Sequence, residues 1–69
     1  MHMRDGDRVL HSAHGEGTVL RAEPEFDEVP WQWGSGDWDR VVQVVFISHG
    51  CALRKWVHRD DLILLMDGE

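Results

Sequence analysis

Three tryptophans lie within eight residues of one glycine-containing segment, and carboxylates flank them on both sides. An indole is costly to leave in water, and tryptophan is enriched among the residues that dominate binding at interfaces. Acidic neighbours favour a basic partner, because complementary charge speeds encounter and excludes wrong partners. This pattern predicts a surface that binds another molecule. The candidate contact residues are Trp31, Trp33, Trp38, Glu28, Asp37 and Asp39.

Two other interpretations of these tryptophans stay open. Indole faces attract cations, so several converging rings would form an aromatic cage for a methylated lysine or another quaternary ammonium group. In so small a protein a large aromatic side chain can instead cover an open end of the core. Trp56 lies outside the segment, in an expected strand, and is predicted to belong to the core.

The remaining reactive residue types form no recognisable catalytic or metal-binding pattern. No two of the five histidines have the spacing of a structural zinc site. His11 and His14 are expected to pack beside a turn and to hydrogen-bond backbone. Cys51 has only His49 nearby to lower its pKa, so a nucleophilic role is not expected. We therefore predict no enzyme activity, no metal and no cofactor.

A basic surface is a further alternative, because Arg54, Lys55 and Arg59 lie close together in the sequence. Together they could bind nucleic acid. The competing interpretation pairs them with Asp60, Asp61 and the acidic segment, each exposed pair contributing less than about 1 kcal/mol. The net charge of -6 makes binding to a phosphate backbone the less favoured interpretation.

Length and composition predict one small folded domain spanning residues 1–69. A single cysteine excludes a disulfide within the chain and, with no signal-like N-terminal segment, indicates the cytosol. No apolar run approaches the roughly 20 residues of a membrane helix. A hydrophobic content of 42% is too high for a disordered tail.

Short runs of β-branched and apolar residues predict strands over 8–11, 18–22, 40–47, 53–58 and 62–66. Gly15 and Gly17 suit a tight reversal between the first two strands. Residues 59–61 could form one 3₁₀ turn before the last strand. The acidic, Trp-rich segment over about 23–39 is too long for a minimal hairpin turn, and such segments are usually functional unless they extend the neighbouring strands. The fold class predicted is all-β, a small five-stranded SH3-like, Tudor-like barrel.

The opening of the chain resembles a known hairpin. Gly6-Asp7-Arg8-Val9, His11 and residues 14–20 are similar to the first hairpin of the Tudor/SH3-like domains in UvrD/PcrA-type helicases and CarD-type regulators. The resemblance implies an SH3-like barrel that docks onto RNA polymerase, within the transcription or repair machinery. Here the acidic, Trp-rich segment replaces a shorter connection, and these 69 residues include neither a helicase nor a DNA-binding domain.

The type II, plasmid-borne dihydrofolate reductase is similar in size and shape and acts as a tetramer. Its catalytic Val-Gln-Ile-Tyr stretch corresponds here to residues 54–57, Arg-Lys-Trp-Val, so that activity is not transferred.

These observations lead to a main hypothesis and two alternatives. The main hypothesis is a non-enzymatic protein-interaction module that binds its partner through the acidic, Trp-rich segment. The first alternative is a homo-oligomer, since residues 41–47 are apolar on both faces of the expected strand and the interface could be structural or enclose a small-molecule pocket. The second is a nucleic-acid-binding module that uses the basic residues of 54–59.

Overall fold

The computed structural model describes residues 3–33, 36 and 38–66. Their regular structure is a sheet of five strands: β1 (Arg8–His11), β2 (Gly15–Arg21), β3 (Val41–Ser48), β4 (Cys51–His58) and β5 (Leu62–Met66). Four 3₁₀ segments accompany it: η1 (Phe26–Glu28), η2 (Trp31–Trp33), η3 (Trp38–Arg40) and η4 (Arg59–Asp61). The all-β class, the last strand and the 3₁₀ turn before it are confirmed. The second and fourth strands begin earlier than predicted.

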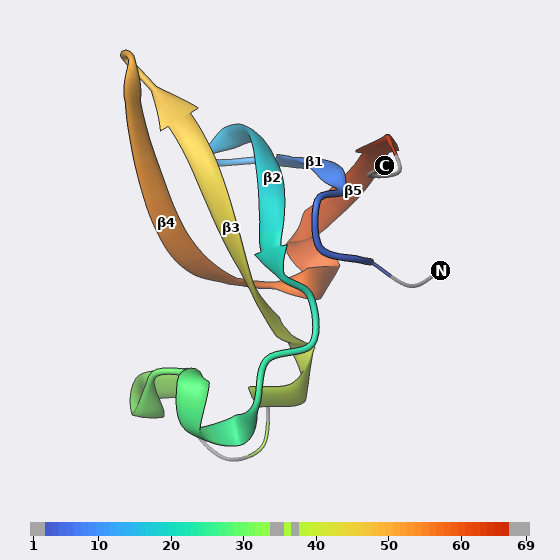
Figure 1. Cartoon of the computed structure of the whole chain (residues 1–69), viewed down its shortest axis with the longest axis vertical. Helices are drawn as coiled ribbons and strands as arrows, with labels where there is room; N and C mark the ends of the chain where they lie inside the picture. Colours follow the sequence, from blue (N-terminus) through green and yellow to red (C-terminus); the bar gives the residue numbers. More distant parts are fainter. Residues whose placement is uncertain (1–2, 34–35, 37, 67–69) are drawn as a thin grey trace.

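All neighbouring strands are antiparallel, in the order β4-β3-β2-β1-β5. The last strand returns to pair with the first, so that Val9 lies opposite Leu64 and His11 opposite Leu62 (Figure 1). The predicted closure into a barrel is not present: β4 and β5, both within the described residues, are the open edges of the sheet. The reason is that η4 turns the chain away from β4, and β5 is held beside β1, where Leu62 joins the core.

The core lies on one face of this bent sheet. Alternate residues of β3, namely Val42, Val44 and Phe46, are at most 1% exposed, as expected where successive side chains point to opposite faces. Val9 and Val19 complete its centre from β1 and β2. The core ends before the tip of the β3–β4 hairpin, which projects beyond the rest of the sheet (Figure 1).

The Gly-Asp sequence near the N-terminus forms a turn that is tied to β2. Gly6 takes a φ of 94°, a conformation that glycine adopts without steric cost. The Gly6 amide donates to the Val19 carbonyl at 2.8 Å, and the Val19 amide donates to the Asp7 carbonyl at 2.9 Å. The buried Asp7 carboxylate accepts from the Arg4 amide at 2.8 Å. This motif therefore has a structural role.

Candidate functional site: an aromatic groove in the acidic lobe

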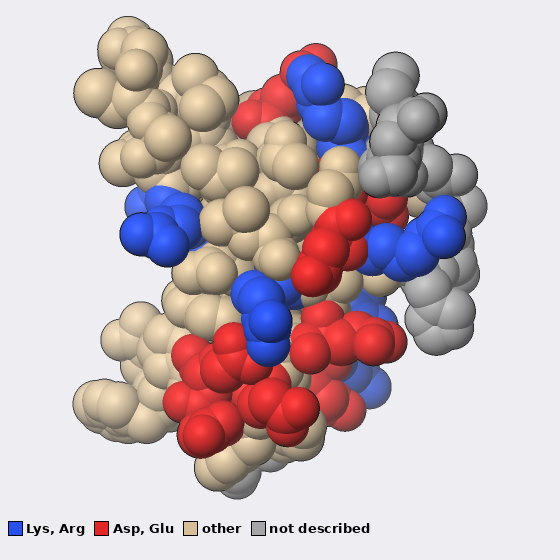
Figure 2. All heavy atoms as spheres, in the orientation of Figure 1, with Lys and Arg blue, Asp and Glu red and all other residues tan. Residues whose placement is uncertain are grey.

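The described residues of 23–40 form a lobe at one end of the sheet, built from η1, η2 and η3 (Figure 1). Acidic side chains gather over the same end of the molecule (Figure 2). Five carboxylates of this stretch are exposed in the structure: Glu23, Glu25, Asp27, Glu28 and Asp39. Where the structure describes it, the acidic, Trp-rich segment is thus a series of short turns, and these five carboxylates face the solvent.

One groove in this lobe combines aromatic rings with carboxylates. Its volume is about 590 Å³. The rings of Phe26 and Trp38 meet edge to face, with centroids 5.5 Å apart and planes at 84°, a favourable geometry for two aromatic quadrupoles. The Trp31 side chain is 91% exposed beside them. We refer to this site as the aromatic groove, lined by Phe26, Asp27, Glu28, Val29, Pro30, Trp31 and Trp38.

Glu28 holds one side of the aromatic groove in place. The Glu25 amide donates to the Glu28 carboxylate at 2.9 Å, and the Arg21 guanidinium forms an ion pair and hydrogen bond with it. The hydrogen bond from the Glu25 amide, followed by that from Arg21, lowers the pKa of Glu28 below its ordinary value. Glu28 therefore lies at the predicted site, but its charge is already engaged within the chain.

The structure separates the predicted contact residues. Trp31, Trp38 and Glu28 share the aromatic groove, whereas Trp33 lines a different hollow beside β4. The Asp39 carbonyl accepts a hydrogen bond from the Arg59 guanidinium at 2.9 Å. Asp37 lies outside the described residues.

Phe26 is a groove residue that was not predicted from the sequence. It is 57% exposed and stands between Glu25 and Asp27. An aromatic residue with acidic neighbours on both sides is a signal that could have been used, since core strands rarely have such neighbours.

The interpretation of the tryptophans as an aromatic cage agrees with the structure only in part. Phe26 and Trp38 supply two walls at nearly a right angle. The ring contacts found among the described residues include neither Trp31 nor Trp33. A cage of three converging rings is therefore not formed by the residues that the structure describes.

The histidines of the first hairpin pack beside the turn, and the predicted hydrogen bond to backbone is found for His11. The rings of His11 and His14 lie 4.6 Å apart, and His14 lies 5.1 Å from Phe46. His11 Nδ1 accepts from the Ala13 amide at 3.0 Å. His14 is exposed, but desolvation by the neighbouring side chains, with smaller effects from His11 and Lys55, lowers its pKa. The described residues contain no group of three or more side chains able to hold a metal ion.

The three residues of the basic alternative do not form one surface. Arg54 pairs with Val45 and Lys55 with Val44 across the β3–β4 ladder, so the two side chains belong to opposite faces of the sheet. The Arg59 guanidinium is engaged with the carbonyl of Asp39. A nucleic-acid site made from these three residues thus has little geometric support.

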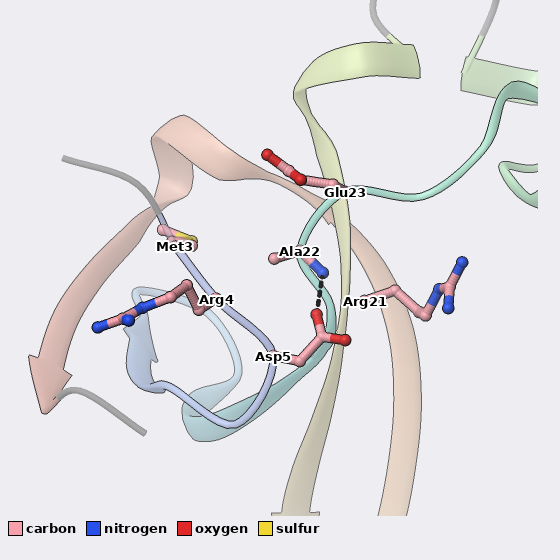
Figure 3. A pocket seen from close by; sticks show the side chains of 6 residues that line it. All are labelled: Met3, Arg4, Asp5, Arg21, Ala22 and Glu23. Atoms are coloured by element: carbon pink, nitrogen blue, oxygen red, sulfur yellow. Dashed lines mark hydrogen bonds between the residues drawn. The ribbon is translucent and has the colours of Figure 1, made fainter. Parts of the chain in front are cut away.

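A smaller hollow beside the N-terminal turn is lined by charged residues whose side chains do not point toward a common position (Figure 3). Its volume is about 340 Å³, and its lining comprises Met3, Arg4, Asp5, Arg21, Ala22 and Glu23. The Asp5 carboxylate accepts from the Ala22 amide at 2.8 Å. Arg4 and Arg21 point away from each other (Figure 3). The hollow connects the turn to the end of β2 and shows no converging charges.

Comparison with protein-family models, with curated proteins and with solved structures found no match for this chain. In the part of the chain that the structure describes, no helix has the length and apolar character needed to cross a bilayer. The functional assignment therefore rests on the geometry of the chain's own residues.

Proposed function

We propose that this chain is a non-enzymatic protein-interaction module whose contact site is the aromatic groove. The observation that carries the proposal is the exposure of Trp31, at 91%, next to the edge-to-face pair of Phe26 and Trp38. Tryptophan is enriched among the few residues that supply most of the binding energy at protein interfaces. The site also holds carboxylates, so it combines apolar area with negative charge.

The partner that fits this chemistry is a segment with both apolar and basic side chains. Apolar groups would bury against Phe26 and Trp38, and Lys or Arg side chains would meet Asp27 and the neighbouring acidic residues. The net charge of -6 adds attraction at longer range. Glu28 contributes mainly by holding η1, because Arg21 already neutralises it.

We further propose that this open sheet is related to the SH3-like folds, although its described strands are not closed into a barrel. The proposed partner is the transcription or repair machinery. Five strands, the pairing of the last strand with the first, and the 3₁₀ turn before the last strand support this fold. The Gly6-Asp7 turn, which carries the resemblance, has a structural role, so it supports the fold more than the partner. Purified RNA polymerase is the probe for the proposed partner.

Trp31→Ala is expected to weaken binding of a short synthetic peptide that alternates Leu with Lys. The loss should be about tenfold or more, equivalent to roughly 1.4 kcal/mol, because an exposed indole at a contact site would be removed. Fluorescence polarisation of the labelled peptide measures the affinity. Competition by RNA polymerase then tests whether it occupies the same site.

The matched control for this measurement is Trp33→Ala, which removes the same side chain from the neighbouring turn. Trp33 lines the other hollow, so peptide affinity should stay within about twofold of the wild type, inside the usual variation for residues away from a contact. A peptide with Glu in place of Lys should not bind. Equal losses for both tryptophan variants, or equal binding of both peptides, would reject the aromatic groove as the contact site.

Self-association is a second candidate function, favoured by the exposed apolar edge of the sheet. β5 carries no charged residue, and its Ile63 and Leu65 side chains are 63% and 46% exposed. Unprotected edge strands of this kind pair readily with another chain. Within residues 41–47, the range of the earlier oligomer hypothesis, Val41, Val42, Val44 and Phe46 are buried inside this chain, whereas Ile47 is exposed. We propose that β5 forms the interface between subunits. This interface could be purely structural or could enclose a small-molecule pocket.

Ile63→Lys is expected to convert such an assembly into a monomer, since a charge on the edge strand opposes pairing. Light scattering across a concentration series measures the mass, which is 8.0 kDa for a monomer. Ile47→Lys is the matched control: Ile47 is 66% exposed but lies on β3, away from this edge, so the assembly should persist. A wild-type protein that stays monomeric at every concentration would eliminate this candidate.

A further inference from the structure

A second hollow lies between η2 and β4, separate from the aromatic groove. Its volume is about 480 Å³, within the range of small-molecule sites. Three stretches distant in the sequence form its lining: the β1–β2 turn, η2 and the second half of β4. We refer to it as the β4 hollow, lined by His14, Gln32, Trp33, Lys55, Trp56 and Val57.

The charge of the β4 hollow is opposite in sign to the net charge of the chain. Its lining contains an ammonium group, an imidazole and a side-chain amide, and none of its residues is acidic. The chain as a whole has thirteen acidic residues. The ion pairs found among the described residues do not involve Lys55.

Three apolar residues complete the β4 hollow: Trp33, Trp56 and Val57. Trp56, which was predicted to belong to the core, is only half-buried. Trp33 is half-buried there, and Val57 is 6% exposed at the point where β4 joins the core. An indole offers a flat face for stacking another ring. Lys55 shares the core-facing side of β4 with Val57, since alternate residues of a strand point to the same face. The hollow thus places a ring face beside hydrogen-bond donors and positive charge.

We infer that the β4 hollow binds a planar aromatic molecule that carries an anionic group. The ring would stack against Trp33, and the anion would accept hydrogen bonds from the Lys55 ammonium and the Gln32 amide. A charge-assisted hydrogen bond is roughly twice as strong as a neutral one. This function goes beyond the protein-interaction module and does not depend on it, because the two sites share no lining residue.

Adenosine monophosphate is the probe for this site, with adenosine and inorganic phosphate as its two halves. When adenosine monophosphate is added to the ¹⁵N-labelled protein, the NMR signals of the Trp33 indole and of Lys55 should shift. Adenosine alone and phosphate alone should each bind at least about tenfold more weakly than the monophosphate, since each lacks one contact. Equal affinity of phosphate, or equal affinity of adenosine, would overturn the inference, because the ring or the charge would then be unnecessary.

Neighbouring residues of β4 supply the matched control. Lys55→Glu should abolish the shifts, and Lys55→Gln should reduce the affinity about tenfold through loss of the charge. Arg54→Glu makes the same charge change one residue away on the opposite face and should leave the affinity unchanged. If Lys55→Glu and Arg54→Glu both abolish binding, only the overall charge of the protein matters. That outcome would contradict a specific site. Trp31→Ala should retain the monophosphate and lose the peptide, so the two proposals can fail independently.

Discussion

Gly17→Ala is expected to destabilise the fold by about 3 kcal/mol, the upper part of the range for an overpacked core. A Cβ at this position would lie 2.6 Å from Val44 Cγ1, 2.7 Å from Phe46 Cδ1 and 2.8 Å from the Val45 carbonyl oxygen. The side chains could move only by disturbing the core. The carbonyl belongs to the β2–β3 ladder and cannot move without loss of pairing. Total stabilities of small domains are about 5–15 kcal/mol, so this change removes a large share.

Urea denaturation followed by circular dichroism measures this effect, with Gly36→Ala as the control. The Cβ added at Gly36 would meet no atom within 4 Å. Its stability should therefore match the wild type within about 0.5 kcal/mol, as for most surface changes. If the two alanine variants unfold at the same urea concentration, β2 does not pack closely against Phe46 at Gly17.

Phe46→Ala is expected to destabilise the fold by about 3–5 kcal/mol, the usual cost of removing a buried aromatic ring. Phe46 is 1% exposed, and it supports the histidine cluster, with ring centroids 5.9 Å from His11 and 5.1 Å from His14. Removal of the ring leaves a cavity beneath the first hairpin. Thermal unfolding and the loss of dispersed NMR signals would report the change.

The second phenylalanine of the chain is the matched control. Phe26 is 57% exposed in the acidic lobe, so Phe26→Ala should change the stability by no more than about 0.5 kcal/mol. It removes the edge-to-face partner of Trp38 and should therefore weaken peptide binding in the aromatic groove. Unfolding of Phe26→Ala to the same extent as Phe46→Ala would show that the lobe is part of the core, and would undermine the proposed contact site.

Much of the fold could be predicted from local sequence. The valine-rich run of β3 and the alternation over β4 specify extended strands, because β-branched side chains suit a pleated surface. Glycines at Gly15 and Gly50 have φ angles of 82° and 79°, so they mark the turns. The 3₁₀ turn at 59–61 and the last strand at 62–66 follow from the same short-range properties.

The candidate site was predicted only in part, and the reason lies in side-chain direction. Trp31 and Trp33 are two residues apart in one short turn, yet they line different hollows. Composition alone treats them as equivalent. Phe26 joins Trp38 across twelve residues of chain, and Arg21 reaches Glu28 from β2. Contacts of this kind depend on how separate turns pack, which no local pattern encodes.

Residue types and their order were enough to specify the all-β class, the succession of strands and turns, and the acidic character of the segment that holds the tryptophans. Long-range packing was needed to leave the sheet open between β4 and β5, and to divide the tryptophans between an acidic groove and a basic hollow. The physical difference is one of range. Strand propensity, turn geometry and charge act over a few residues, whereas closure and convergence depend on which distant surfaces gain most by excluding water together.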